Sequence, residues 1–360
     1  MRILIDIGHP AHVHLFSPFA SEMKLKGHEI LFTCREKEHE KTLLQAYGNN
    51  YVCLGKHYST KIGKVWGLLR FDMQLLLVAW RFKPDLFLSA GSFYAAHVAY
   101  LMCKPHLSFE DTFNYEQVRL YEPFTKVIFT SDYRHPCVSK KEIHYSGYHE
   151  LAYLHPKRFT PNGSILEELG VVGNEKYVIV RLVSWKATHD VGHKGIFYEN
   201  KLKAIEEFSK FAKVFISSEA ELPEELRKYQ IKIEPHRMHD ALAFASLIFG
   251  ESSTMSEEAV MLGTPAVYLL TKSTFYTRHL EEDYGLMFNY SESEEDQIKA
   301  IAKGVELLQM KNVKERWKEK RDKMLADKID VTAFLVWFVE NWPDSFKIMK
   351  KDPDYQNRFK

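Results

Sequence analysis

The strongest constraint on the fold lies between residues 247 and 270, where apolar runs alternate with polar turns. Residues 247–249 form a short apolar run that ends at Gly250, and residues 266–270 form a second one. Between them lies a helical pattern that Gly263 and Pro265 bring to an end, because neither residue favours a further helical turn. A buried strand, a tight turn, a helix and another buried strand predict one repeat of a parallel α/β sheet.

Three consecutive hydroxyl side chains, Ser252, Ser253 and Thr254, stand where this helix begins. The first N–H groups of a helix have no internal partners and the helix dipole favours negative charge there, so a phosphate or diphosphate can bind. Glu257 and Glu258 follow, and either carboxylate can accept two hydrogen bonds from a ribose diol. An ordinary helix cap that binds nothing is the alternative. Because these five residues exceed what a cap requires, we expect a nucleotide site.

Composition limits the class of protein. A length of 360 residues indicates two domains, and a net charge of +1 predicts no nucleic-acid partner. The four cysteines form no Cys-x-x-Cys pair, which argues against a zinc site or a disulfide framework. The chain begins with the pattern of a strand instead of a signal peptide. It contains no run of about 18 apolar residues, so no membrane span is expected. We therefore expect a cytoplasmic protein.

The start of the chain repeats the α/β pattern, with strands at residues 3–7 and 29–34 around a helix. The intervening loop and helix start carry His9, His12 and His14. A metal site is one interpretation, but no acidic residue or cysteine lies nearby to complete its set of ligands. Buried histidines with a structural role are a second interpretation. A general base is the third, because imidazole titrates near neutral pH and the loop follows a strand's carboxyl end. We expect one of the three to be that base.

Two further strands should end at the same edge of this sheet. The first is followed by a small-residue turn that contains Ser92, which can approach a sugar or phosphate closely. The second is followed by Glu110 and Asp111, which suit sugar hydroxyls or acid–base work. Capping of the helix that begins near residue 114 is an equally good explanation for the two acids.

The second half of the chain restarts the pattern with a strand at residues 177–181. Arg181 and Lys186 at its carboxyl end suit a nucleotide diphosphate, and His189 follows in the same loop. Residues 231–234 are predicted to form a short strand, and the loop after it should pass the base of the nucleotide.

Residues 56–83 interleave basic and apolar side chains. An amphipathic helix packed on its own sheet explains most of this segment. Its basic and aromatic beginning also suits contact with an anionic membrane surface, which would place the protein at the inner face of the membrane.

The segment Gly-Glu-Ser-Ser-Thr-Met-Ser-Glu-Glu-Ala from Gly250, followed by Leu-Gly-Thr-Pro, resembles the nucleotide-binding segment of GT-B glycosyltransferases and hydrolysing UDP-N-acetylglucosamine 2-epimerases. It is more similar still to a family of prokaryotic GT-B-like proteins described only as a domain of unknown function. That family also carries a Gly-x-x-Glu-x-Ala-Tyr-Leu segment, found here from Gly147 to Leu154. The resemblance implies that Glu258 binds the ribose of UDP and that residues 252–254 face the diphosphate.

The same resemblance implies an α/β chain of the GT-B class, with two doubly wound Rossmann-type domains facing a cleft. Its predicted parts are an acceptor-side domain at residues 1–155, a linker at 156–165, a nucleotide-sugar-binding domain at 166–329, a helix at 330–345 that crosses back to the first domain, and a tail at 346–360. Glu150 then lies beside the cleft. His12 occupies the place of an active-site histidine in several inverting members, although the usual glycine-rich run before it is missing.

The resulting functional hypothesis is a metal-independent transfer of sugar from a nucleotide sugar, with UDP as the expected nucleotide. The acceptor would be a glycan or lipid-linked molecule in surface polysaccharide or glycoconjugate synthesis, and no cofactor is expected. A hydrolysing 2-epimerase is the first alternative, but those enzymes carry an Asp in the turn where this chain has Ala90-Gly91-Ser92. A nucleotide-sugar-binding protein without catalysis is the second alternative.

Overall fold

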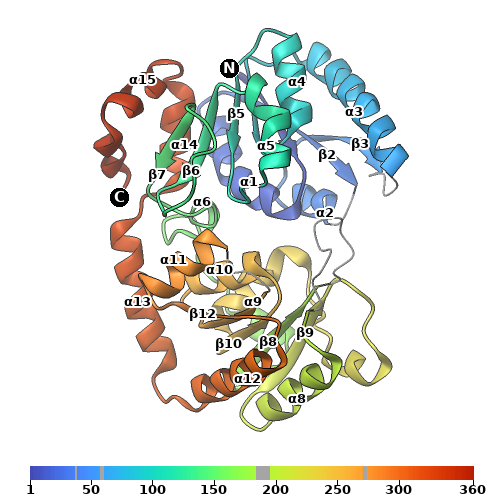
Figure 1. Ribbon diagram of the computed structural model, residues 1–360, viewed down its shortest axis with the longest axis vertical. Helices are drawn as coiled ribbons and strands as arrows, with labels where there is room; N and C mark the ends of the chain where they lie inside the picture. The colour runs from blue at the N-terminus through green and yellow to red at the C-terminus, as the bar shows by residue number, and fades with distance from the viewer. Residues whose placement is uncertain (37–38, 57–60, 184–194, 271–273) are drawn as a thin grey trace. The chain divides into compact units, whose positions relative to one another are not determined.

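The computed structural model describes residues 1–36, 39–56, 61–183, 195–270 and 274–360. The chain divides into two compact units (Figure 1). Unit 1 comprises Met1–Arg158 and Lys328–Lys360, and unit 2 comprises Phe159–Asp327. The chain therefore leaves unit 1 once and returns to it for its last helices.

Unit 1 is built on a seven-stranded sheet with the order β3-β2-β1-β4-β5-β6-β7, in which every pairing is parallel. Its strands are β1 (Arg2–Ile7), β2 (Glu29–Glu36), β3 (Tyr51–Lys56), β4 (Leu86–Ala90), β5 (His106–Phe109), β6 (Val127–Ser131) and β7 (Glu142–Tyr145). The chain order reverses between β1 and β4. In doubly wound sheets ligands bind beyond the carboxyl ends of the strands at such a reversal.

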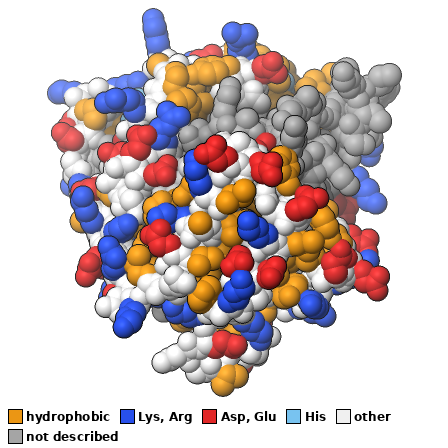
Figure 2. Space-filling view, turned by 60° about the horizontal axis from the view of Figure 1, so that its bottom comes forward, with side chains coloured by type: hydrophobic (Ala, Val, Ile, Leu, Met, Phe, Trp, Pro, Cys, Tyr) orange, Lys and Arg blue, Asp and Glu red, His pale blue; other side chains and the backbone are white. Residues whose placement is uncertain are grey.

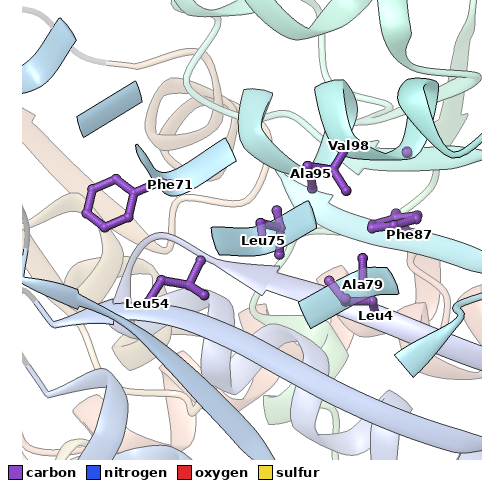
Figure 3. Packing of buried hydrophobic residues seen from close by; sticks show 9 residues of the cluster. Leu4, Leu54, Phe71, Leu75, Ala79, Phe87, Ala95 and Val98 are labelled. Atoms are coloured by element: carbon purple, nitrogen blue, oxygen red, sulfur yellow. The ribbon is translucent and has the colours of Figure 1, made fainter. Parts of the chain in front are cut away.

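Helices follow the strands of unit 1. They are α1 (Pro10–Leu25), α2 (Glu40–Ala46), α3 (Lys61–Phe82), α4 (Phe93–Leu101), α5 (Tyr115–Tyr121) and α6 (Leu151–Leu154), with the returning α14 (Val331–Glu340) and α15 (Asp344–Lys351). The strands read as nearly continuous apolar runs because helices cover both faces of a parallel sheet. One core cluster joins β1 and β4 to the inner faces of α3 and α4 (Figure 3). Its α3 members are Phe71, Leu75 and Ala79.

Arg158 fixes the returning helix to unit 1. Asp330 is the N-cap of α14 and accepts a hydrogen bond from the backbone N–H of Ala333 at 3.0 Å. The Nε and Nη2 atoms of Arg158 both donate to Asp330, with distances of 3.0 and 2.7 Å to Oδ2. The hydroxyl of Thr332 donates to the carbonyl of Ala152 at 2.7 Å. The residues after 351 continue as a 3₁₀ helix, Pro353–Phe359.

Unit 2 has a five-stranded sheet with the order β12-β11-β10-β8-β9, again parallel throughout. Its strands are β8 (Tyr177–Leu182), β9 (Lys213–Ser218), β10 (Leu247–Gly250), β11 (Ala266–Leu269) and β12 (Met287–Tyr290). Its α-helices are α7 (Ile165–Glu168), α8 (Tyr198–Ser209), α9 (Met238–Phe244), α10 (Ser253–Met261), α11 (Phe275–Glu282), α12 (Glu294–Gln309) and α13 (Val313–Asp327). Here the chain order reverses between β8 and β10.

The prediction of a strand at residues 231–234 is wrong. The chain makes one isolated parallel bridge, between Ile216 and Gln230, and then leaves the sheet. Two 3₁₀ helices, Glu224–Tyr229 and Pro235–Arg237, flank this point closely. The N–H of Ile231 still donates to the carbonyl of Ile216 at 2.9 Å, but no strand forms over residues 231–234.

No helix in the described part of the chain is both long enough and apolar enough to cross a bilayer.

The two faces of α3 provide a test of the packing. Leu75 is 0% exposed in the core cluster, whereas Leu77, two residues later, is 51% exposed. Leu75→Ala should lower the free energy of unfolding by about 2–5 kcal/mol, because it leaves a cavity. Leu77→Ala changes the same residue type on the same helix and should cost about 0.5 kcal/mol or less. Denaturant unfolding measures both variants, and equal losses would contradict the burial of Leu75.

Candidate active site

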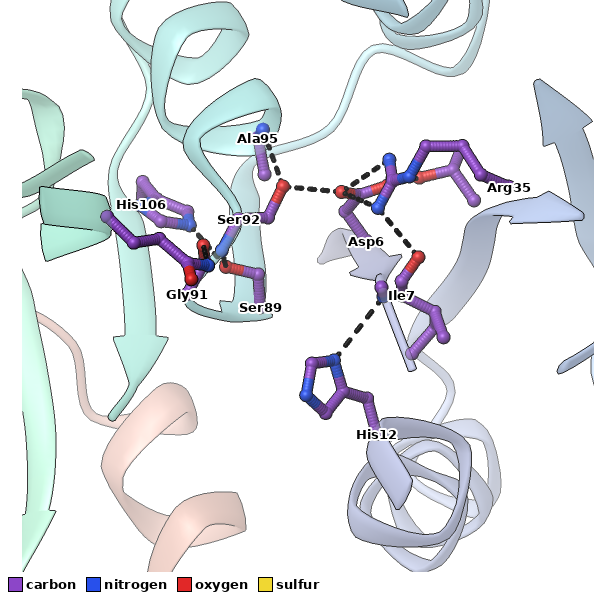
Figure 4. A network of polar contacts seen from close by, with 12 residues as sticks. Asp6, Ile7, His12, Arg35, Ser89, Gly91, Ser92, Ala95 and His106 are labelled. Atoms are coloured by element: carbon purple, nitrogen blue, oxygen red, sulfur yellow. Dashed lines mark hydrogen bonds and ion pairs between the residues drawn. The ribbon is translucent and has the colours of Figure 1, made fainter. Parts of the chain in front are cut away.

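A buried ion pair joins the carboxyl ends of β1 and β2 (Figure 4). Asp6 is 0% exposed, and Nη1 of Arg35 donates to both of its carboxylate oxygens at 3.0 Å. Nη2 of Arg35 also donates to Asp6 at 3.0 Å and to the carbonyl of Ile7 at 2.7 Å. A buried charge is tolerated only when it is paired and hydrogen-bonded, so Asp6 and Arg35 depend on each other.

The same carboxylate reaches across the reversal point to β4. The hydroxyl of Ser92, the N-cap of α4, donates to Asp6 at 2.5 Å and accepts from the N–H of Ala95 at 3.2 Å. Thr33 on β2 donates to the other oxygen of Asp6 at 2.7 Å. The structure therefore gives Ser92, which the sequence placed in the cleft as a possible ligand contact, a structural role at the start of α4. The loop that carries the N-terminal histidines begins directly after this network.

The three histidines of that region have different surroundings. His14 is buried, hydrogen-bonds Tyr47 through Nδ1 at 2.8 Å and stacks on Tyr153, which is a packing role. His9 is the N-cap of α1, and its Nδ1 accepts from the N–H of Ala11 at 3.2 Å.

His12 remains as a candidate for chemistry. The N–H of Gly8 donates to its Nδ1 at 3.3 Å, which assigns the ring proton to Nε2. Burial lowers the pKa of His12 to about 3, and the neighbouring His9 acts in the same direction. His12 is therefore neutral near pH 7 and presents Nε2–H as a hydrogen-bond donor.

Asp111 and His149 form an ion pair beyond β5. The Nδ1 atom of His149 lies 3.0 Å from Oδ2 of Asp111. The imidazole packs edge-on against Phe109 and lies parallel to Tyr145, and only 11% of its side chain is exposed. Among the described residues its Nε2 is buried without a hydrogen-bond partner. The Asp111 side chain is 43% exposed, so it is the more accessible member of the pair.

Each member of this pair favours the charged form of the other. Burial alone would lower the pKa of His149, but the adjacent Asp111 carboxylate raises it above its usual value. Desolvation would raise the pKa of Asp111, but the charge and hydrogen bond of His149 lower it. The charge on Asp111 also opposes the lowering of the pKa of His12, so the three groups interact electrostatically.

The acids on either side of this pair are buried. Glu110 accepts hydrogen bonds from Thr112 and from the N–H of Phe113, both at 2.8 Å, and from the hydroxyl of Tyr121. Burial, followed by the charge of Asp111, raises the pKa of Glu110. These contacts give Glu110 a role in bracing the turn after β5, whereas the helix cap that was its alternative role is supplied by Asn114. Glu150 is 6% exposed and raises the pKa of His149 through its charge.

In unit 2 the expected hydroxyls do begin a helix. Ser252 is the N-cap of α10, with its Oγ accepting from the N–H of Met255 at 3.3 Å. Ser253 and Thr254 are the first two residues of the helix. Gly250 before them has a φ of +153°, and a Cβ there would lie 2.0 Å from the carbonyl oxygen of Arg181. Only glycine therefore allows β10 to approach β8 this closely.

The two glutamates of α10 are both buried, at 4% exposure for Glu257 and 5% for Glu258. The Nε2 atom of His239 on α9 lies 2.9 Å from Oε1 of Glu258. His239 therefore orients the carboxylate expected to bind a ribose. The sequence alone did not pair His239 with Glu258.

Arg181 makes its hydrogen bonds on the β9 side of the sheet. Its Nη1 donates to Ser217 at 3.0 Å and its Nη2 to Glu219 at 2.6 Å. The structure thus pairs this predicted diphosphate ligand with a carboxylate. Lys186 and His189, the other predicted residues of this loop, lie outside the described residues.

Glu251 is a further residue that sequence analysis did not single out. Its carboxylate accepts from the N–H of Val183 at 2.7 Å and from the N–H of Ile196 at 2.6 Å. It thereby joins the end of β8 to the residues before α8. The signal in the sequence for Glu251 was its place in the Gly-Glu-Ser-Ser segment. The signal for Asp6 was its position as an isolated charge in an apolar strand. In the described part of the chain, no group of three His, Cys, Asp or Glu residues has the arrangement of a metal site.

Comparison with known proteins assigns the family. The family described as "Protein of unknown function (DUF354)" matches residues 1–333. The chain belongs to this family. A comparison with curated proteins gave no match.

Solved structures similar to this DUF354 protein include a co-structure with UDP, a UDP-GlcNAc 2-epimerase and a glycosyltransferase. The S. aureus MnaA–UDP co-structure has a TM-score of 0.66 at 13% identity, covering 96% of this chain and 97% of that chain. UDP-GlcNAc 2-epimerase from Neisseria meningitidis, bound to UDP-GlcNAc, has a TM-score of 0.60 at 16% identity, covering 90% and 100%. The glycosyltransferase SsfS6 from Streptomyces sp. SF2575 has a TM-score of 0.61 at 13% identity, covering 95% and 100%. The prediction of a GT-B-like fold is confirmed.

The burial of the Asp6–Arg35 pair predicts that replacing Arg35 destabilises the protein much more than replacing Arg2, although both arginines bridge the same two strands. Arg35→Met leaves the Asp6 charge buried and unpaired, so the free energy of unfolding should fall by about 3–5 kcal/mol. Arg2 pairs with Glu29 across the same two strands, but these side chains are 43% and 61% exposed. Arg2→Met should therefore cost about 1 kcal/mol or less. Denaturant unfolding compares them, and equal costs would remove Asp6–Arg35 as the anchor of the site.

Proposed function

We propose that this DUF354 protein is a metal-independent glycosyltransferase that moves a sugar from a UDP-sugar to a hydroxyl group of a glycan or lipid-linked acceptor. The observation that carries the proposal is the Asp111–His149 ion pair, which interacts electrostatically with the neutral His12 at the carboxyl ends of the unit 1 strands. An ionised carboxylate held by a buried histidine, with a neutral N–H donor next to it, suits proton removal from a sugar hydroxyl.

Asp111 is the group proposed to take the proton. Its side chain is 43% exposed, whereas Nε2 of His149 is buried, so an acceptor hydroxyl reaches Asp111 more readily. The hydroxyl oxygen attacks the anomeric carbon of the donor, the bond from that carbon to the diphosphate breaks, and the hydroxyl proton passes to Asp111. A carboxylate of low pKa suffices, because the hydroxyl becomes more acidic as its bond to the anomeric carbon forms. His149 positions Asp111, and Nε2–H of His12 donates to a substrate oxygen.

Unit 2 is proposed to hold the donor. The N-terminal N–H groups of α10, with the hydroxyls of Ser252, Ser253 and Thr254, would bind the diphosphate and stabilise the charge that develops on it as it leaves. Glu258, oriented by His239, would accept hydrogen bonds from the ribose. The co-structure with UDP and the epimerase bound to UDP-GlcNAc share this fold and support UDP as the nucleotide. Transfer requires the donor in unit 2 to face Asp111 in unit 1.

The turn after β4 favours transfer over 2-epimerisation. The resembling epimerases carry an acid–base Asp in the middle of this turn, where this chain has Gly91, which has no side chain. An epimerase mechanism would therefore lack one of its acid–base groups.

The proposal predicts a specific loss of turnover in Asp111→Asn. UDP release from UDP-sugars should fall by about 10²-fold or more, because the amide cannot accept the proton. Asp72→Asn is the matched control, since Asp72 holds Nδ1 of His97 at 3.1 Å in a pair between α3 and α4. That variant should retain turnover. Equal turnover in both variants would contradict the role of Asp111, and UDP binding without any turnover in the native protein would identify a binding protein instead.

A further inference from the structure

Helix α3 has an apolar outer face that the fold does not cover. Leu69, Met73, Leu77 and Trp80 are 65%, 57%, 51% and 70% exposed. At 3.6 residues per turn these positions fall within an arc of about 80°. We call these four residues the α3 stripe. Because the inner face of the same helix is buried in the core cluster (Figure 3), α3 is apolar on two faces, whereas a surface helix is normally polar on its outer face.

The charges that border the stripe are basic. Arg70 and Arg81 are exposed and lie on one flank of it, and Lys83 is exposed just beyond the end of the helix. The helix contains a single acidic residue, Asp72, which lies outside the stripe and is paired with His97. The face of the molecule drawn in Figure 2 differs, because Lys and Arg side chains are interspersed there with Asp and Glu.

We propose that the α3 stripe binds an anionic lipid surface. A helix lying in the plane of a bilayer buries its apolar side chains at the boundary between headgroups and acyl chains, while flanking arginines remain at the lipid phosphates. Trp80 suits this interface because its ring has an apolar body and a polar N–H. Figure 1 shows α3 at the margin of unit 1, where the helix can lie along such a surface.

Charge favours lipid over a second copy of the chain. A two-fold dimer through the stripe would bring the same patch of both copies together, so the arginines bordering each stripe would lie near those of the other. Like charges close together oppose such an interface, whereas anionic headgroups neutralise them.

The direction of α3 connects this surface with the site. The helix follows β3 and precedes β4, which is parallel to it in the same sheet, so α3 begins at the carboxyl edge that carries His12 and Asp111. A membrane along α3 therefore extends toward that edge. This geometry favours a lipid-linked molecule as the acceptor, and that consequence rests on the proposed function. The lipid contact itself does not rest on the proposed function.

The test is co-sedimentation of the full chain with vesicles of equal parts phosphatidylcholine and phosphatidylglycerol, compared with phosphatidylcholine alone. The protein should bind the anionic vesicles, and binding should weaken as salt rises. The double variant Leu77→Gln/Trp80→Gln should reduce partitioning by about tenfold or more, because it removes apolar surface from the interface. The matched control is Leu25→Gln/Val172→Gln, which changes two residues that are 86% and 79% exposed outside α3. The control should bind as the native chain does.

Two results would overturn the proposal. The first is absence of binding to the anionic vesicles, or equal binding by the two double variants. The second is a native dimer in light scattering that becomes a monomer in Leu77→Gln/Trp80→Gln, which would assign the stripe to a second copy. Vesicle binding is measured without turnover. If the protein does not bind vesicles, the proposed role of Asp111 still stands. If Asp111→Asn retains full turnover, the proposed lipid contact still stands.

Discussion

The buried Asp6–Arg35 pair is the interaction on which the arrangement of the unit 1 site depends. It ties β1 to β2, reaches β4 through Ser92, and holds the carbonyl of Ile7 immediately before the histidine loop. Removing either charge would leave the other buried without its counterion, with only uncharged hydrogen-bond partners. The network thereby holds the carboxyl end of β1 and the loop after it, which carries His12. Asp111 follows β5, which is separated from β1 in the sheet by β4 alone.

The two units divide the proposed chemistry between them. Unit 1 supplies the Asp111–His149 pair, in which each member favours the charged form of the other, and a neutral His12 whose pKa is lowered by burial. Unit 2 supplies a helix N-terminus with hydroxyl side chains and a glutamate oriented by His239. Each unit gains its part from the same feature, a reversal of strand order at the carboxyl edge of a parallel sheet.

The sequence was sufficient for the architecture because apolar runs, glycine stops and helix caps are local signals. It predicted the βαβ unit around Gly250 and the helix that begins after Ser252. It did not predict which polar residues pair, because those partners lie far apart in the chain: Asp6 with Arg35, Asp111 with His149, and His239 with Glu258. For Arg181, which was expected to face a diphosphate, it did not predict the hydrogen bonds to Ser217 on the paired strand and to Glu219 just beyond that strand.

The central claim, a nucleotide site at the start of α10, is tested most directly by calorimetric titration of the full chain with UDP. The native protein should bind, and Glu258→Gln should weaken binding by about tenfold or more, because the amide loses the charge-assisted hydrogen bonds to the ribose. This variant retains an oxygen that can accept from His239, so the local packing is preserved. Glu306→Gln, which changes an exposed glutamate on α12, should bind UDP as the native protein does. Absence of UDP binding, or equal binding by the two variants, would contradict the account.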